Sequence, residues 1–309
     1  MTTRHSSREL LDLVIDEGSW ESWDCEPEQP AAPGSAYAAE LEKARERAGT
    51  DESVVTGRGT ISGRPVALVV GEFGFLAGSI GHAATTRLVS AIRRATREKL
   101  PLFAAPTSGG TRMQEGTPAF LGMVKVAAAV TEHKAAGLPY VVYLRHPTTG
   151  GVMASWGSLG HFTVAEPGAL LGFLGPRVFE ALYGEKFPEG VQVAENLYRQ
   201  GLIDAIVPIE DLKEVASRAL DVLMWRREDL PELVELPRDE LAVVPAWESI
   251  TRSRRPNRPG LRDLLRNSAD VVIPLRGTAA GEHDDTILMC LARFGDTSCV
   301  VIGHDRRYQ

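Results

Sequence analysis

The chain has 309 residues, of which 43% are hydrophobic and 24% are charged, so it has the composition of a globular protein and enough length for one large domain or two smaller ones. A formal net charge of −7, from 34 basic and 41 acidic residues, excludes a surface that binds polyanions over its whole extent. Three cysteines without a CxxC pair exclude a disulfide framework and a four-cysteine zinc site, so no metal is predicted.

The N-terminal stretch MTTRHSSREL is polar and has no apolar core of signal-peptide length. No window of about 18 apolar residues is present to span a bilayer. Together with the few cysteines, these features predict a cytoplasmic protein with no membrane segment.

The first fifty residues predict a helical segment. Residues 8–23 place apolar side chains on one helical face before Gly18: Leu10, Leu11, Val14 and Ile15. A proline-rich connector over 27–33 and a short helix over Ala38–Ala48 follow. We therefore take residues 1–50 as an N-terminal helical segment.

A β-hairpin opens the main domain. The β-rich runs Val54–Ile61 and Pro65–Val70 flank the turn Ser62-Gly63-Arg64. Helical spacing and short apolar runs then alternate. The helical positions are 88, 92 and 95, then 120, 124, 127 and 130, then a short helix from 152; the β-like runs are 102–105, 140–144, 162–165 and 169–173. This alternation predicts an α/β fold with a largely parallel sheet.

Two glycine pairs stand where a β-like run turns toward a helix. They are Gly109-Gly110 in TSGGTRMQEG and Gly150-Gly151 in TTGG. At such a turn the first N–H groups of the helix have no intrahelical acceptor, and glycine lets a ligand approach them closely. Two such turns can stabilise one developing oxyanion, for example a thioester enolate. Two ordinary tight turns are the alternative interpretation.

Other chemistries are less well supported. Neither GxGxxG nor GxxxxGK[ST] is present, and Ser108, Ser155 and Ser158 are not in GxSxG. The histidines nearest the glycine turns, His146 and His161, are more typical of structural or surface groups than of a general base.

Arg112 follows the first glycine pair and has two open interpretations. It can pair with Glu115, three residues further on, as an ordinary helix-surface ion pair. Alternatively, it can hold an anionic group near the turn. The spacing does not favour one over the other.

Residues 251–266 (TRSRRPNRPGLRDLLR) contain six arginines and one acid. The run has no aromatic residue to stack on bases and ends in an amphipathic helix pattern, so we interpret it as a linker and docking segment and not as a nucleic-acid arm.

The sequence also contains an internal repeat. The runs that begin at Asp51 and at Asp284 align without a gap for about twenty residues: a β-like run, a polar turn and a second apolar run. Chance similarity between two hairpins of equal length is the alternative interpretation.

Several linked motifs resemble the carboxyltransferase β subunit of bacterial acetyl-CoA carboxylase. They span about residues 8–210 in order: EFGFLAGSIG (72–81), TSGGTRMQEG (107–116), GLPYVVYLRHPTTGGVMAS (137–155), AEPGALLGFLGPRV (165–178) and QGLIDAIV (200–207). From Trp247, the run SRRPNRPGLRDLL and the strand ending Val301-Ile302-Gly303 resemble the start of the partner α subunit.

The resemblance implies a crotonase-like ββα spiral with the start of a second similar domain. It implies an enzyme that transfers a carboxyl group from carboxybiotin on a carrier protein to acyl-CoA, giving malonyl-CoA from acetyl-CoA in fatty acid biosynthesis. Backbone N–H groups at Gly109, Gly110, Gly150 and Gly151 are the implied catalytic groups, and Ser108, Arg112 and Met153 are candidate substrate-binding residues.

On this basis residues 51–235 form a β-type crotonase-like domain, and residues 236–309 form a linker and a truncated start of an α-type domain. The family's N-terminal four-cysteine zinc ribbon has no counterpart here. The implied partners are acyl-CoA, a biotin carboxyl carrier protein, a biotin carboxylase subunit and an α-type half, fused or separate, in a homo- or hetero-oligomer, with neither nucleic acid nor membrane. Two alternatives remain open: a malonyl or methylmalonyl thioester decarboxylase, and a non-catalytic CoA-binding scaffold.

Overall fold

The computed structural model describes residues 4–28, 31–225, 244–255, 257–276 and 281–305. The chain divides into two compact units, Met1–Asp221 with Leu275–His283, and Val222–Pro274 with Asp284–Gln309. The predicted boundary between residues 235 and 236 lies outside the described residues, and the three-part division stays a prediction.

The helices of the described part are α1 Ser7–Val14, α2 Ala36–Ala48, α3 His82–Arg97, α4 Gly116–Ala135, α5 Gly150–Val152, α6 Pro176–Tyr183, α7 Ala194–Arg199, α8 Leu212–Leu223, α9 Ala246–Ser253 and α10 Leu261–Ser268. The strands are β1 Glu21–Ser22, β2 Val54–Ile61, β3 Arg64–Gly71, β4 Leu102–Ala105, β5 Tyr140–Leu144, β6 Thr148–Thr149, β7 Phe162–Ala165, β8 Leu171–Gly172, β9 Ala205–Ile206, β10 Val271–Leu275, β11 Ile287–Phe294 and β12 Thr297–His304.

The first unit is built on one sheet in the order β1-β2-β3-β4-β5-β7-β9. β1, β2 and β3 pair antiparallel, whereas every pairing from β3 to β9 is parallel. The strands β4, β5 and β7 are buried along their whole length, as expected for parallel strands covered by helices. The predicted α/β class with a largely parallel sheet is confirmed.

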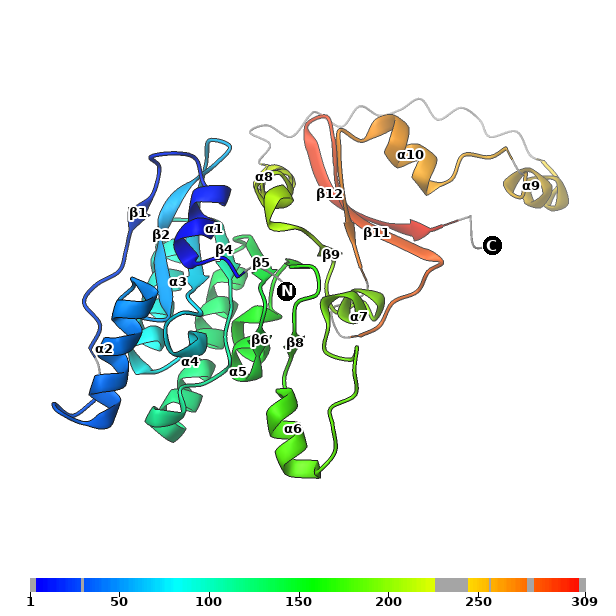
Figure 1. Ribbon diagram of the computed structural model, residues 1–309. Helices are drawn as coiled ribbons and strands as arrows, with labels where there is room; N and C mark the ends of the chain where they lie inside the picture. Colours follow the sequence, from blue (N-terminus) through cyan, green and yellow to red (C-terminus); the bar gives the residue numbers. More distant parts are fainter. Residues whose placement is uncertain (1–3, 29–30, 226–243, 256, 277–280, 306–309) are drawn as a thin grey trace. The chain divides into compact units, whose positions relative to one another are not determined.

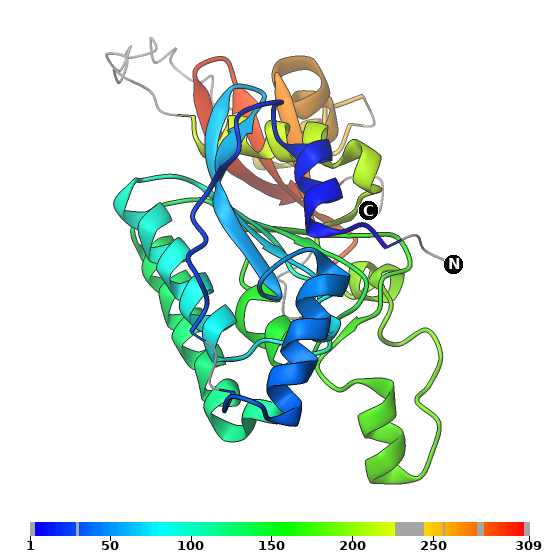
Figure 2. The same ribbon diagram turned by 60° about the vertical axis from the view of Figure 1, so that its left-hand side comes forward.

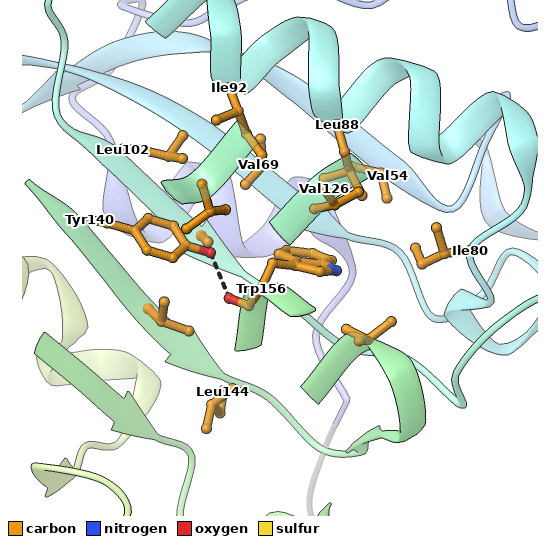
Figure 3. Close-up of a cluster of buried hydrophobic side chains, with 14 of the residues drawn as sticks. Val54, Val69, Ile80, Leu88, Ile92, Leu102, Val126, Tyr140, Leu144 and Trp156 are labelled. Carbon is orange, nitrogen blue, oxygen red and sulfur yellow. Dashed lines mark hydrogen bonds between the residues drawn. The ribbon is translucent and has the colours of Figure 1, made fainter. Parts of the chain in front are cut away.

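Helices α3 and α4 lie side by side over one face of this sheet (Figure 1). The core forms between these helices and the sheet, and Figure 3 shows Trp156 at its centre. The hydroxyl group of Tyr140 donates to the carbonyl oxygen of Trp156 at 2.6 Å. The two helices are in close contact at Gly122 of α4, where a Cβ atom would lie only 2.6 Å from Thr85 Oγ1 of α3.

Two predicted elements differ from the structure. The first helix ends at Val14, before Gly18, and Glu21–Ser22 form a strand. The helix ends early because the next segment binds the β2–β3 hairpin: Asp16 N–H donates to Thr60 O at 2.8 Å. Figure 2 shows this N-terminal segment beside the hairpin. Of the run 169–173, only Leu171–Gly172 is a strand, and it pairs with β6 apart from the main sheet.

In the second unit, α10 packs on a small sheet in the order β10-β11-β12. The buried residues between them are Leu265, Cys290 and Ala292, joined by Val301 and others. The predicted docking helix in the basic segment is therefore α10, whose apolar face covers this sheet.

The internal repeat predicted from the sequence is present as two hairpins of the same register. β2 pairs with β3 from Val54↔Gly71 to Ile61↔Arg64, and β11 pairs with β12 from Ile287↔His304 to Phe294↔Thr297. Each turn has two residues, and the first has a positive φ: 50° at Ser62 and 53° at Gly295. Each residue of the second hairpin lies the same number of residues after its counterpart in the first hairpin.

The repeat extends further than the sequence alignment. A helix and an edge strand precede each hairpin, α1 and β1 in one case and α10 and β10 in the other. After each hairpin the chain closes in the same way: Glu72 N–H donates to Ser53 O at 2.7 Å, and Asp305 N–H donates to Thr286 O at 2.7 Å. Both acids are buried, and both contact the start of the preceding helix, Glu72 at Ser7 and Asp305 at Arg262.

An aspartate caps the hairpin turn in both copies. The carboxylate of Asp16 accepts the N–H of Ser62 at 3.1 Å, and that of Asp270 accepts the N–H of Gly295 at 2.7 Å. Their own N–H groups donate to the strand before the turn: Asp16 to Thr60 O at 2.8 Å and Asp270 to Arg293 O at 2.8 Å. An αβββ arrangement therefore occurs twice in the chain, with α2 inserted between β1 and β2 in the first copy.

Candidate functional site

The two glycine pairs follow neighbouring strands of the first sheet. Gly109-Gly110 comes after β4 and Gly150-Gly151 after β5, and these strands pair in parallel, so their carboxyl ends meet at one edge. The loops continue the pairing, since Ser108 N–H donates to Pro147 O at 2.7 Å and Thr149 N–H donates to Ser108 O at 3.0 Å. The sheet topology brings together two pairs that are distant in the sequence.

Gly110 and Gly150 lie against each other. A Cβ atom on Gly150 would lie 3.4 Å from Gly110 Cα, and φ is +116° at Gly110 and +65° at Gly150. L-residues with a side chain rarely adopt such angles, so both positions favour glycine for the backbone conformation itself. The loops after β4 and β5 therefore meet at these two glycines.

The N–H groups of the first pair are engaged within the protein. Gly109 N–H donates to Ala77 O at 2.9 Å, and Gly110 N–H donates to Ser108 Oγ at 3.0 Å. The hydroxyl group of Ser108, which is fully buried, donates in turn to Gly78 O. Ser108 therefore holds the turn through its hydroxyl group, which contacts both Gly110 and Gly78.

The second pair opens a helix directly. Gly150 and Gly151 begin α5, which continues as a π-helical turn over Met153–Gly157. The side chain of Thr149 does not cap this helix. The N–H groups of a first helical turn have no intrahelical acceptor, and this distinguishes the second pair from the first, whose N–H groups bind acceptors within the protein.

The sequence predicts that the first pair leads straight into a helix, and this prediction is wrong. A 3-10 turn over Met113–Glu115 intervenes, and α4 begins only at Gly116. The intervening residues are tied to the segment after β3, since Ile80 N–H donates to Gly110 O at 3.0 Å. The turn at Gly110 is therefore held by backbone pairing and not by a helix terminus.

A strained segment beside the first pair was not singled out from the sequence. Leu76, Ala77 and Gly78 have φ values of 44°, 56° and 65°. A Cβ atom on Gly78 would lie 2.2 Å from Thr107 O, so the segment presses against the loop that carries Gly109. Consecutive left-handed residues with side chains persist only when their surroundings hold them. The only signal in the sequence was the glycine spacing in EFGFLAGSIG.

Met153 is half-buried and packs on the hydrophobic core. The methionine that contacts the glycine turn is Met123 of α4, whose Cγ would lie 3.1 Å from a Cβ on Gly151. Helical spacing placed Met123 within α4 but could not show which methionine faces the turn.

Arg112 is fully buried, and its closest partner is the buried carboxylate of Glu52. Glu115 also lies 3.5 Å from its guanidinium group, so the pairing that the sequence spacing allowed is present but is the longer of the two. The burial favours a structural role for Arg112 over direct contact with an anion.

The two histidines near the site hold backbone groups. His146 Nδ1 accepts the N–H of Leu170 at 3.1 Å, and His161 Nδ1 accepts the N–H of Tyr140 at 3.1 Å. Burial lowers the pKa of His146, which keeps the ring neutral near pH 7. Both contacts agree with the structural interpretation of these residues.

A cavity of about 360 Å³ lies away from the glycine pairs, between α3 and the connector before α2, and is lined by residues such as Trp23, Ser90 and Arg97.

Within the described ranges, no group of three or more His, Cys, Asp or Glu side chains could hold a metal ion. None of the helices in the part of the chain that is described has the length and apolar character needed to cross a membrane.

Comparison with known proteins identifies relatives over nearly the whole chain. It is 56% identical over 307 residues to a probable biotin-dependent acyl-coenzyme A carboxylase β3 subunit of Mycobacterium tuberculosis, covering 98% of this chain and 61% of that protein. It is 39% identical over 236 residues to the acetyl-coenzyme A carboxylase carboxyl transferase subunit β of Brucella anthropi, covering 74% of this chain and 78% of that protein. The chain thus spans less than two thirds of the length of the mycobacterial relative.

The fold matches that of a transcarboxylase 12S structure with a TM-score of 0.74 at 22% identity, over 98% of this chain and 57% of that one. The crotonase-like α/β fold expected from the resemblance is confirmed by this match. Residues 3–309 match the carboxyl transferase domain. The chain therefore belongs to the carboxyl transferase domain family.

Proposed function

We propose that this chain is the carboxyltransferase component of a biotin-dependent acyl-CoA carboxylase. It would transfer a carboxyl group from carboxybiotin on a carrier protein to an acyl-CoA, with acetyl-CoA giving malonyl-CoA for fatty acid biosynthesis. The contact between Gly110 and Gly150, which joins two loops at one sheet edge, is the observation that carries this proposal. Membership of the carboxyl transferase domain family supports it.

The proposed chemistry needs charge stabilisation on oxygen. Carboxybiotin would release its carboxyl group as CO2 by breaking its N–C bond, the biotin nitrogen freed in this way would take the proton from the acyl α-carbon, and the resulting enolate would attack the carbon of the released CO2. We assign the N–H groups of Gly150 and Gly151, at the uncapped start of α5, to one developing oxyanion. Gly109 and Gly110 would serve a second oxyanion after exchanging their present acceptors.

We further propose that the second unit begins an α-type half of the same enzyme. The repeated αβββ arrangement supports this assignment. By register, Val300 and Ile302 on β12 correspond to Ala67 and Val69 on β3. Ala67 and Val69 are fully buried in the core cluster that includes α3, whereas Val300 and Ile302 are 58% and 66% exposed.

The exposed face of β12 therefore matches a face that a helix covers in the first unit. A second α3-like helix would cover it, and a β4-like strand would pair along the edge of β12 as β4 pairs with β3; a longer form of the polypeptide or a separate subunit would supply both. The proposed assembly also contains a biotin carboxylase subunit and a carrier protein. We place it in the cytoplasm, as the cysteine usage predicts.

The test is the native assembly that contains this chain, purified and supplied with acetyl-CoA and carboxylated carrier. Carboxylated acyl-CoA that forms only when biotin is present supports the proposal. Loss of a carboxyl group from malonyl-CoA without biotin would instead favour a decarboxylase. Turnover that survives valine substitution at Gly110 and at Gly151, with the fold intact, would leave a scaffold role.

A further inference from the structure

We propose that Arg112 is a positioning residue for the turn at Gly110, acting through a buried ion pair with Glu52 and not by contact with substrate. The inference rests on the proposed function, because the turn at Gly110 belongs to the proposed oxyanion site. It concerns how that site is held and assigns Arg112 a role other than anion binding.

The guanidinium group of Arg112 has no exposed face. The side chains of Arg112 and Glu52 are both 0% exposed. The Arg112 guanidinium donates to both carboxylate oxygens of Glu52 and to Ser79 O at 2.8 Å, with longer contacts to the hydroxyl groups of Ser53 and Tyr37. Burial lowers the pKa of Arg112 and the Glu52 carboxylate raises it, with a net upward shift, so the group stays charged. A substrate anion would have to displace a buried carboxylate to reach it.

The backbone contacts show what the side chain holds. Gly109 N–H donates to Ala77 O, Ile80 N–H donates to Gly110 O at 3.0 Å, and Arg112 N–H donates to Ile80 O at 3.0 Å. Ser79, whose carbonyl oxygen the guanidinium group binds, lies between Ala77 and Ile80. Arg112 therefore fixes the middle of the segment whose two ends carry the turn at Gly109-Gly110.

This segment needs such support. Leu76 and Ala77 have positive φ values of 44° and 56°, which are unfavourable for residues with side chains and persist only when the surroundings hold them. Lysine could not replace Arg112, because only a planar guanidinium group binds a carboxylate and a carbonyl oxygen in fixed directions at the same time.

Glu115 completes the network. Its carboxylate accepts the hydroxyl group of Tyr37 at 2.5 Å and the N–H of His82 at 2.5 Å. Helix α3 has Gly81 as its N-cap, which has no side chain to bind the first N–H groups, so Glu115 serves as the cap. The start of α3 and the turn at Gly110 are thus fixed by one buried charge cluster.

The test compares Arg112→Lys with wild type in the native assembly, with kcat and KM for acyl-CoA measured per mole of folded enzyme. We expect kcat to fall by about 10- to 100-fold, because misplacing a catalytic group by about 1 Å has that effect, with KM changed less than about threefold. Arg93→Lys, which alters an exposed pair with Glu132, serves as the matched control and should retain wild-type kcat.

A raised KM with unchanged kcat would overturn the proposal in favour of substrate binding. Wild-type values for both constants would overturn it in favour of a purely structural ion pair. If Arg112→Lys does not fold, Glu52→Gln replaces it, since this variant keeps the shape and loses the charge; unchanged kcat in that variant also overturns the proposal. Absence of carboxyl transfer in the wild-type assembly is a separate result, which would reject the proposed function itself.

Discussion

Gly150 lies so close to Gly110 that a Cβ atom added to it would be 3.4 Å from Gly110 Cα, although the two residues follow different strands. The contact forms because β4 and β5 are parallel neighbours and the loops after them stay paired through Ser108 and Thr149. We therefore expect substitutions in either glycine pair to disturb the same turn.

Alanine at Gly110 or Gly150 is expected to reduce activity by about 100-fold or more, on the scale of losing one oxyanion donor. The reason is a shifted turn, because φ is +116° and +65° at these positions and a side chain disfavours both. The measurement is carboxyl transfer by the native assembly. Gly137→Ala is the matched control, since φ is +73° and a Cβ there meets nothing within 4 Å. Equal activity in all three variants would contradict the proposed role of the turn.

Gly122→Ala is expected to destabilise the protein by about 1–3 kcal/mol, the usual cost of overpacking. The new Cβ would lie 2.6 Å from Thr85 Oγ1 and 3.1 Å from Thr85 Cγ2. Thr85→Ala removes both atoms, of which the hydroxyl oxygen is buried and has no hydrogen-bond partner. The double variant should therefore recover most of the loss in urea unfolding, and additive effects would show that the two helices do not meet at these residues.

Stability is expected to fall as the pH drops below about 6.5, partly because of His133. This side chain is fully buried, and burial lowers its pKa from 6.5 in the folded state. The unfolded chain binds the proton first as the pH falls, so the contribution of His133 is complete above the unfolded pKa and is lost as the pH falls toward the folded one. Urea unfolding between pH 8 and pH 5 measures this slope. His133→Gln should flatten it, whereas replacing the exposed His304 by Gln should not.

The two hairpin caps give a matched pair of tests. Asp16→Ala leaves the turn N–H groups of Ser62 and Gly63 without their acceptor, and Asp270→Ala does the same at Gly295. Asp270→Ala should cost about 1 kcal/mol, the value of one hydrogen bond, and Asp16→Ala should cost more, because Asp16 also accepts the hydroxyl group of Thr60 and pairs with Lys213. Hydrogen exchange should quicken in β2–β3 for the first variant and in β11–β12 for the second. No change in either hairpin would mean that the repeated aspartates do not support these turns.

Much of the fold could be predicted from periodicity. The strands 102–105, 140–144 and 162–165 match to the residue, because short apolar runs between helices give a clear pattern in parallel sheets. The end of the first helix could not be predicted in this way, because the chain leaves the helix where Asp16 binds the distant hairpin at Thr60. Tertiary contacts of this kind have no local signal.

The candidate site was predictable in position but not in detail. Glycine spacing pointed to both turns, and parallel strand order explains why they meet. The acceptors of the first pair, Ala77 O and Ser108 Oγ, were not predictable, because they depend on how the segment after β3 folds back. The partner of Arg112 was also missed, since Glu52 is far away in the sequence whereas Glu115 is near.

The last prediction concerns the exposed face of β12. If the second unit is part of an α-type half, Val300 and Ile302, which are 58% and 66% exposed here, become buried when that half is complete. Aspartate at either position should leave this chain folded, because the side chains face away from the cluster under α10. The same change should prevent the complete enzyme from assembling, since it would bury an unpaired charge. Sedimentation of the native assembly checks this. Thr297→Asp, at the exposed hairpin end, is the control, and normal assembly of the Val300→Asp and Ile302→Asp variants would contradict an α-type second half.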